Sequence, residues 1–181
     1  VTAEACPLNL APTSSTTATL AMGDALAVAC MHAKGFTKED FARSHPGGAL
    51  GRRLLTHVRD VMRTGDAGPC VKEDISVLDA VREITKKHIG MTAVVNADNV
   101  VTGIFTEGDL RRLIEKRGDI RAIPIAEVMT KTPRTIEADA MAAAAARILE
   151  ETLVNQLLVV DKAGHLVGAL HLHDLMTAKV I

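Results

Sequence analysis

Hydrophobic and polar positions follow one order twice along the second two-thirds of the chain. Each time, apolar residues at helical spacing are followed by two short, mostly apolar runs with a polar turn between them. This pattern predicts a helix and then a hairpin of two strands. Apolar strands that alternate with helices predict helices packed on a small sheet. The predicted helices are 77–87 and 141–151, and the predicted strands are 92–96, 100–105, 156–161 and 165–170.

The two halves of this pattern form an internal repeat. Residues 103–110 (GIFTEGDL) recur as 168–175 (GALHLHDL), and the Val-Met segment at 60–62 recurs at 127–129. One unit of about 60 residues has little core of its own, so we expect the two units to pack face to face and share a core. Three methionines are expected to line this shared core, because their side chains adapt to irregular gaps: Met62, Met91 and Met129.

The first 55 residues follow a different pattern. A hydroxyl-rich start at 12–17 predicts a helix that runs to about Lys34, and Gly35 stands where a helix-ending glycine belongs. That helix is apolar nearly all round, which is typical of a helix buried in a larger protein. A second short helix at 38–43 leads to the segment 44–53, whose proline and glycines predict a tight turn. We therefore divide the chain into domains at 1–55, 56–120 and 121–181.

Composition excludes several classes of protein. The net charge is -1 and Trp and Tyr are absent, so we expect no nucleic-acid partner. The longest apolar run, 20–31, is interrupted by Asp24, so we expect no membrane span. The chain begins without Met, and we expect it to be a fragment of a longer protein. The cysteines are odd in number and lack metal-binding spacing, which predicts no metal site and three reduced, mostly buried thiols in a cytoplasmic protein: Cys6, Cys30 and Cys70.

The order of the elements and the string Gly-apolar-apolar-Thr-x-x-Asp at 103–109 resemble the CBS domain, the regulatory module named after cystathionine β-synthase. The resemblance covers about residues 56–181, and it rests on two strings in register, each preceded by a Val-Met segment. It implies an α/β fold, a tandem CBS domain pair of β-α-β-β-α units. It also implies a regulatory ligand, either an adenine nucleotide or a nucleotide-activated sugar.

Two segments outside the repeats, 6–16 and 44–52, are very similar to the closing segment of arabinose 5-phosphate isomerases. In that family a sugar isomerase domain precedes a CBS pair. The enzyme interconverts D-arabinose 5-phosphate and D-ribulose 5-phosphate without a redox cofactor, in the pathway to the lipopolysaccharide sugar Kdo. The resemblance implies that 1–55 is the C-terminal helical segment of an α/β sugar isomerase domain, in a homotetramer that contains dimers of CBS pairs.

The family's catalytic lysine and glutamates have no counterpart in this sequence, so we expect this chain alone to be inactive. An alternative from another class is a free-standing nucleotide-sensing CBS module without catalysis. The segment Ser44-His45-Pro46-Gly47-Gly48 discriminates between the two, because a bare sensor has no reason to keep it.

His45 is the candidate catalytic residue. Aldose–ketose isomerisation needs a group that both takes and gives a proton near neutral pH, and an imidazole with a pKa of ~6.5 does so. The residues alone favour a plain role in the turn before Pro46. The resemblance places the family's catalytic histidine at His45. Arg52, with Arg43 and Arg53 nearby, is a candidate for holding the sugar phosphate.

Hydroxyl residues at the start of the first predicted helix are weaker substrate candidates. Free N–H groups at a helix N-terminus favour an anion such as a sugar phosphate. Simple N-capping by a hydroxyl is an equally good interpretation, and the sequence leaves both open. The residues concerned are Thr13, Ser14 and Ser15.

Thr106 and Asp109 have two interpretations. Their spacing is that of a capping box, with Thr at the N-cap and a carboxylate three residues later. It is also the CBS motif, in which the resemblance implies that Asp holds a ribose diol and Thr approaches a phosphate. In the second repeat His171 replaces the threonine, so we expect the capping box to be lost there while Asp174 remains, which favours ligand binding. We expect one cleft in which Thr106, Asp109, His171 and Asp174 hold a single asymmetric ligand.

Overall fold

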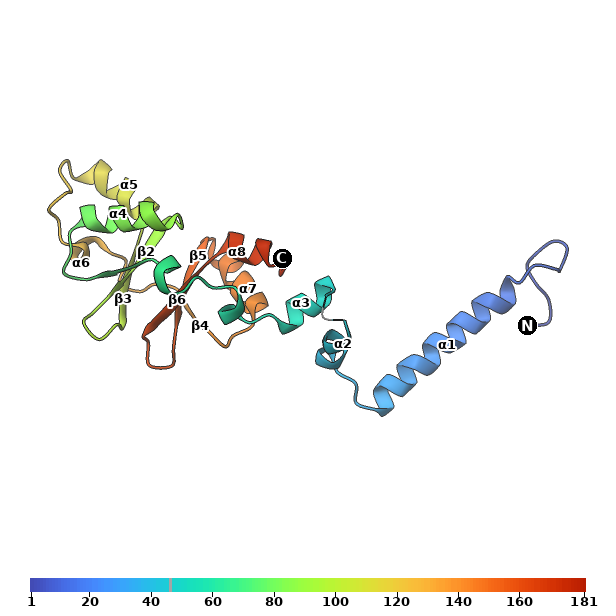
Figure 1. Ribbon diagram of the computed structural model, residues 1–181. Coiled ribbons are helices and arrows are strands. Elements are labelled where there is room, and N and C mark those ends of the chain that lie inside the picture. Colours follow the sequence, from blue (N-terminus) through green and yellow to red (C-terminus); the bar gives the residue numbers. More distant parts are fainter. Residues whose placement is uncertain (46) are drawn as a thin grey trace. The chain divides into compact units, whose positions relative to one another are not determined.

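The computed structural model covers residues 1–181 and describes the backbone of every residue except Pro46, and all side chains except those of Pro46, Ala49 and Leu50 (Figure 1). The chain divides into two units, Val1–Ser44 and His45–Ile181, which we describe separately. The helices of the described chain are α1 (Ser14–Ala33), α2 (Lys38–Ser44), α3 (Ala49–Leu55), α4 (Val77–Lys87), α5 (Glu107–Lys116), α6 (Ile125–Val128), α7 (Ala142–Thr152) and α8 (Leu172–Thr177), with short 3-10 turns at Val58–Asp60 and Gly65–Ala67. The strands are β1 (Cys70–Lys72), β2 (Met91–Val95), β3 (Val101–Thr106), β4 (Thr135–Glu137), β5 (Gln156–Val160) and β6 (Leu166–His171).

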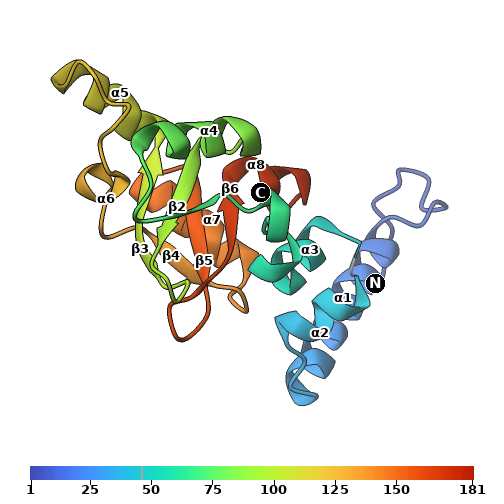
Figure 2. The same cartoon turned by 60° about the vertical axis from the view of Figure 1, so that its left-hand side comes forward.

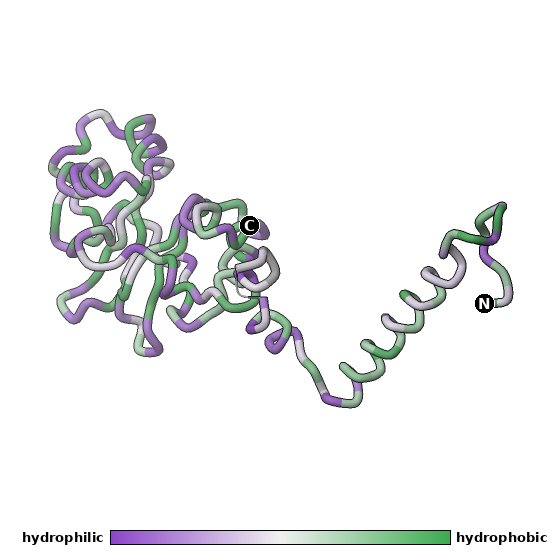
Figure 3. The backbone as a smooth tube through the Cα atoms, turned by 45° about the vertical axis from the view of Figure 1, so that its right-hand side comes forward, coloured by the Kyte–Doolittle hydropathy of each residue, from purple (hydrophilic) through white to green (hydrophobic). Residues whose placement is uncertain are grey.

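In the first unit, α1 has the predicted length and ends at Gly35, whose φ of +60° lies in the left-handed region that glycine adopts readily. None of its residues is buried, although apolar residues recur along its whole length (Figure 3). Because Cys30 lies on this helix, its thiol is exposed, and the expectation of mostly buried thiols is wrong for it. Cys6 and Cys70 are half-buried.

The second unit contains two three-stranded sheets of the same design, in the orders β1-β2-β3 and β4-β5-β6. In each sheet the first two strands are parallel and the last two are antiparallel. The predicted repeat of helix and hairpin is therefore confirmed. The strands of the hairpins differ from the predicted ranges by about one residue at their ends. Both hairpins carry a register irregularity near the turn, at Val94/Val95 and Val159/Val160.

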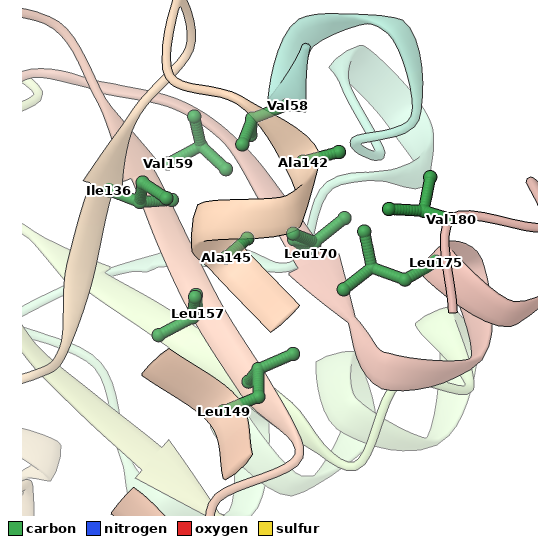
Figure 4. Packing of buried hydrophobic residues seen from close by; sticks show 10 residues of the cluster. All are labelled: Val58, Ile136, Ala142, Ala145, Leu149, Leu157, Val159, Leu170, Leu175 and Val180. Atoms are coloured by element: carbon green, nitrogen blue, oxygen red, sulfur yellow. The ribbon is translucent and has the colours of Figure 1, made fainter. Parts of the chain in front are cut away.

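Alternating side chains divide each sheet between two cores. In β2, Met91 and Ala93 face the other repeat, where they pack with Leu158 and Ala169, whereas Val94 packs under α4 and α5. The corresponding core under α7 and α8 is shown in Figure 4. The two repeats thus pack face to face and share a central core, as predicted, with the helices on the outer faces (Figures 1 and 2).

The hairpin turns of the two repeats pair with each other. Asn99 and Gly164 both have left-handed backbones, with φ of +64° and +85°. The Leu166 N–H donates to the Asn99 carbonyl at 3.0 Å, and the Val101 N–H donates to the Gly164 carbonyl at 3.1 Å. These reciprocal bonds show that the repeats are related by an approximate twofold axis.

Each Val-Met segment packs on the other repeat. The Arg63 N–H and carbonyl pair with Ala169 at 2.8 and 3.0 Å, and the Thr130 N–H and carbonyl pair with Ile104, both at 2.9 Å. These leader segments, 56–63 and 123–130, complete the core of the opposite repeat: Val58, Val61 and Met62 join the second, and Ile125, Val128 and Met129 join the first. Of the three methionines predicted to line the shared core, Met91 lies in it, whereas Met62 and Met129 pack against the outer cores through the leader segments.

Candidate functional site

The first half-site, defined here as Thr106, Asp109 and Arg112, lies where β3 passes into α5. The Asp109 carboxylate accepts from the Thr106 N–H at 2.9 Å and from its hydroxyl at 2.7 Å, and the Thr106 hydroxyl accepts from the Asp109 N–H at 3.1 Å. This is the predicted capping box. The other carboxylate oxygen accepts from Arg112 on the next turn of the same helix.

A surface cavity of about 250 Å³ adjoins this half-site. Its lining contains one carboxylate, that of Asp109, together with three positive side chains and the apolar residues Leu113 and Val128. The positive groups are Arg112, Lys116 and Arg117. A cavity with this lining suits a ligand that presents both an anion and an apolar surface.

The second half-site, defined here as His171, Asp174 and Arg63, lies where β6 passes into α8. The prediction that its capping box is lost was wrong. The His171 N–H donates to the Asp174 carboxylate at 2.9 Å, and the His171 Nδ1 accepts from the His173 N–H at 3.0 Å. An imidazole nitrogen without a proton is an acceptor as good as a hydroxyl, so histidine replaces threonine as the cap. The retention of Asp174 therefore has a structural reason, and a missing cap no longer supports a ligand role for it.

The pKa of His171 is lowered from its ordinary value. Burial of the ring is the main cause, and the positive charges of Arg63 and His173 add to it, while Asp174 opposes the shift. The shift favours the neutral ring, and the hydrogen bond that Nδ1 accepts from the His173 N–H requires the neutral form with its proton on Nε2.

Arg63 is a site residue that sequence reasoning missed. Its guanidinium donates to both Asp174 carboxylate oxygens, from Nε at 3.2 and 3.1 Å and from Nη2 at 3.0 Å. Its Nη1 also donates to the Lys87 carbonyl at 3.4 Å. The two partners are 111 positions apart, and the Val-Met leader that carries Arg63 was the only sequence signal near it. The sequence could not show that this leader crosses to the other repeat.

In the first unit, the predicted anion position at the start of α1 is occupied by a side chain of the protein itself. The Glu4 carboxylate accepts from the Thr13 N–H at 2.7 Å and from the Ser15 N–H at 3.2 Å. The Thr13 hydroxyl does not cap the helix; it accepts from the Ala5 N–H at 2.9 Å. Hydrogen bonds from Ser15 and Thr13 lower the pKa of Glu4 to about 2. The helix terminus does bind an anion, and that anion is Glu4.

The segment around His45 is described in part, since Pro46 lies outside the described residues. His45 is exposed, and its carbonyl accepts from the Gly48 N–H at 3.1 Å. Arg52 donates from Nη1 to the Gly47 carbonyl at 2.5 Å, and its Nε is buried without a hydrogen-bond partner among the described atoms. The structure therefore places His45 and Arg52 beside the same turn. Thr13, Ser14 and Ser15 belong to the other unit.

Within the described residues, no three His, Cys, Asp or Glu side chains are arranged so that they could hold a metal ion. Among the described helices, none combines the length and the apolar character needed to cross a bilayer.

Comparison with known proteins places this architecture in a family. The CBS domain family matches residues 58–116 and 125–181. The chain is 51% identical over 181 residues to arabinose 5-phosphate isomerase KdsD of Escherichia coli (strain K12), and 52% identical over 178 residues to KdsD of Pseudomonas aeruginosa. These matches cover 100% and 98% of the chain, but the chain spans only about half the length of these relatives, 55% of each.

Solved structures agree with the family match. The crystal structure of CBSX2 in complex with AMP superposes with a TM-score of 0.57 at 27% identity, covering 68% of this chain and 95% of that one. A CBS-domain-containing protein from Agrobacterium tumefaciens superposes with a TM-score of 0.59 at 25% identity, covering 68% of this chain and 93% of that one. Because the family matches well over half of the residues and the two sheets have the same design as these pairs, the chain belongs to the CBS domain family.

Proposed function

We propose that this chain is the regulatory part of an arabinose 5-phosphate isomerase, and that its CBS pair binds an adenine nucleotide or a nucleotide-activated sugar. The observation that carries the proposal is 51% identity to KdsD over the whole chain, including the segments that precede the CBS pair. The whole protein would interconvert D-arabinose 5-phosphate and D-ribulose 5-phosphate in the cytoplasm, on the pathway to lipopolysaccharide Kdo. Within this proposal, residues 1–55 belong to the sugar isomerase domain, and 56–120 and 121–181 are the two CBS domains.

The exposed apolar surface of α1 supports this organisation. Four of its large apolar side chains are more than half exposed: Leu20, Met22, Leu26 and Val28. Contiguous exposed apolar surface on a helix is expected to be covered by further protein. The isomerase domain and the other subunits of a homotetramer would cover it.

In the catalytic part of the proposal, His45 is the acid/base that moves protons, and Arg52 helps to hold the sugar phosphate. The buried, unpaired Nε of Arg52 supports the second role, because a buried donor without a partner is rare. Thr13, Ser14 and Ser15 are weaker substrate candidates, since Glu4 already accepts from two of their N–H groups. No cofactor is required for the reaction.

In the regulatory part, Asp109 accepts from the ribose diol, and Thr106 and the start of α5 approach the phosphate. The solved relative with bound AMP supports the choice of an adenine nucleotide. The geometry supports this choice of residues, because the N-terminal end of α5 carries partial positive charge and Arg112 pairs with Asp109 there. His171 and Asp174 occupy the corresponding places in the second repeat.

Calorimetric titration with AMP, ADP, ATP and a cytidine-activated sugar tests this role. Asp109→Asn should weaken binding of the best ligand by about tenfold or more, because it removes the charged acceptor for the diol. It should lower the free energy of unfolding by about 1 kcal/mol or less, since the amide oxygen still accepts within the box.

The matched control is Asp79→Asn. Asp79 makes the same kind of capping contact at the start of α4, where its carboxylate accepts from the Ser76 hydroxyl at 2.8 Å. This variant should bind with wild-type affinity. Equal affinity in wild type and Asp109→Asn, or equal losses in both variants, would remove Asp109 from the ligand site.

A further inference from the structure

The two half-sites differ in what holds their carboxylates. In the second half-site, both oxygens of Asp174 accept from the forked guanidinium of Arg63, and one of them also accepts from the His171 N–H. The Asp174 side chain is 16% exposed and that of Arg63 is 26% exposed. A two-pronged Arg–carboxylate contact of this kind is stronger and more directional than a single hydrogen bond. A ribose diol needs the same oxygens, so it must compete with Arg63 for them.

In the first half-site the cation is held far less firmly. Arg112 pairs with Asp109 from the next turn of the same helix, and its side chain is 64% exposed. An exposed pair at this spacing contributes little, and its long side chain moves aside at small cost. Asp109 itself is only 12% exposed, so its position is fixed while its cationic neighbour is free to move.

The difference between the half-sites traces to one pair of equivalent positions. Arg63 pairs through its backbone with Ala169, and Thr130 pairs in the same way with Ile104. Ala169 and Ile104 are equivalent in the two repeats, so Thr130 occupies the place of Arg63. A threonine side chain is uncharged and too short to extend two donors to a carboxylate. The first half-site therefore lacks the contact that fills the second.

Arg63 also has a partner on the first repeat, because its Nη1 donates to the Lys87 carbonyl at the end of α4. Lys87 in turn donates to the Asp66 carbonyl, in the 3-10 turn that follows the leader with Arg63, and its ammonium lies 3.7 Å from the Glu83 carboxylate. The guanidinium therefore has partners on both repeats, and its release needs more than the loss of one ion pair.

We propose that Arg63 blocks the second half-site, so that the CBS pair takes one nucleotide, at Asp109, and not two. This proposal rests on the proposed nucleotide binding of the pair. In this proposal Arg63 determines which half-site binds the nucleotide and does not itself contact the nucleotide.

The test is calorimetric titration of the 181-residue chain with AMP. Wild type should bind one AMP per chain, and Asp109→Asn should weaken that binding by about tenfold or more. Arg63→Thr, which copies the first repeat, should bind a second AMP. The double variant Arg63→Thr/Asp174→Asn should lose that second AMP and keep the first.

The reverse variant, Thr130→Arg, tests the proposal independently if Arg63→Thr does not fold. Thr130 is exposed, so Thr130→Arg has room for its side chain and should place a guanidinium beside Asp109. It should weaken AMP binding by about tenfold or more while its melting temperature stays near that of wild type.

Other results of these titrations would contradict either the block by Arg63 or the binding of AMP at Asp109. Two AMP molecules on wild type would overturn the block, and so would only one on Arg63→Thr when wild type already binds one. Loss of the single AMP in Arg63→Thr would make Arg63 a ligand contact instead. If wild type binds no AMP but Arg63→Thr binds one through Asp174, the assignment of Asp109 fails and the block stands. If neither binds, both proposals fail.

Discussion

At position 171 an imidazole does the work that a hydroxyl does at position 106. Both side chains accept from a backbone N–H of the helix that follows, and both residues donate their own N–H to an aspartate three positions later. Of the two acceptors, only the imidazole takes up a proton in the physiological range. A protonated His171 Nδ1 cannot accept from His173, so this cap depends on pH.

We expect His171 to make the folded chain less stable in mild acid. The pKa of His171 in the fold lies below its ordinary value of 6.5, so the unfolded chain binds the proton first as pH falls. The stability that neutral His171 provides is thus complete above about pH 6.5 and is lost as pH falls below that value. His171→Thr, which copies the first repeat, should reduce this loss. Urea unfolding of both proteins from pH 8 to pH 5 measures it, and parallel pH profiles would contradict the expectation.

At the scale of elements, the exchange of leader segments between the repeats depends on two glycines. A Cβ placed on Gly168 would lie 2.8 Å from the Arg63 carbonyl oxygen and 2.9 Å from the Met62 sulfur. A Cβ on Gly103 would lie 2.5 Å from the Met129 sulfur and 3.1 Å from the Thr130 carbonyl oxygen. Both glycines therefore allow a leader to lie directly against a strand of the other repeat. The GIF and GAL strings carry glycine for this packing reason.

Substitution of the two glycines by alanine should lower the free energy of unfolding by different amounts. Gly168→Ala forces a backbone oxygen away and should lower the free energy of unfolding by about 2–3 kcal/mol, whereas Gly103→Ala meets mainly a flexible methionine and should cost about 1 kcal/mol. Gly118→Ala, where nothing lies within 4 Å, should change it by about 0.5 kcal/mol or less. Urea unfolding of the three variants measures this order. A Gly168→Ala protein as stable as Gly118→Ala would show that the leader does not lie against β6.

At the scale of the whole molecule, the two units have different relations to their surroundings. The CBS pair has three buried apolar clusters of its own, whereas α1 has no buried residue despite its apolar composition. A unit with its own core is expected to fold by itself, and a helix without one needs a partner. The regulatory half of the proposed enzyme should therefore be testable with this chain, and the catalytic half only in a longer one.

Isomerase activity is expected only in a chain extended to the length of its relatives. The 181-residue chain should not convert arabinose 5-phosphate, because the family's lysine and glutamates lie outside it. In the extended protein, His45→Ala should lower kcat by about 10²-fold or more, the usual contribution of a positioned acid/base. The control His165→Ala, at a half-buried histidine in the turn between β5 and β6, should keep wild-type kcat. Near-normal turnover in His45→Ala would assign His45 to the turn alone.

The sequence by itself determined the elements, their twofold repetition and the family. Helix and strand periods, the caps at Thr106 and Gly35, and the repeated Gly strings are all local, and each depends on residues within a few positions of one another. Position 171 differs from this local prediction, because histidine is not among the usual capping residues and yet its Nδ1 accepts a hydrogen bond from the helix as a hydroxyl would.

Tertiary structure alone decided the partners of the site. The pairing of Arg63 with Asp174 depends on a leader that crosses to the opposite sheet, and the capping of α1 by Glu4 depends on the path of a loop. In both cases a carboxylate, that of Asp174 or of Glu4, accepts hydrogen bonds from donors that are distant in sequence and that only the fold brings close to it. The repeat predicts that Arg63 and Thr130 occupy equivalent places. Only the crossing of the leaders shows that Arg63 reaches the Asp174 carboxylate, whereas the first half-site has a threonine at the equivalent place.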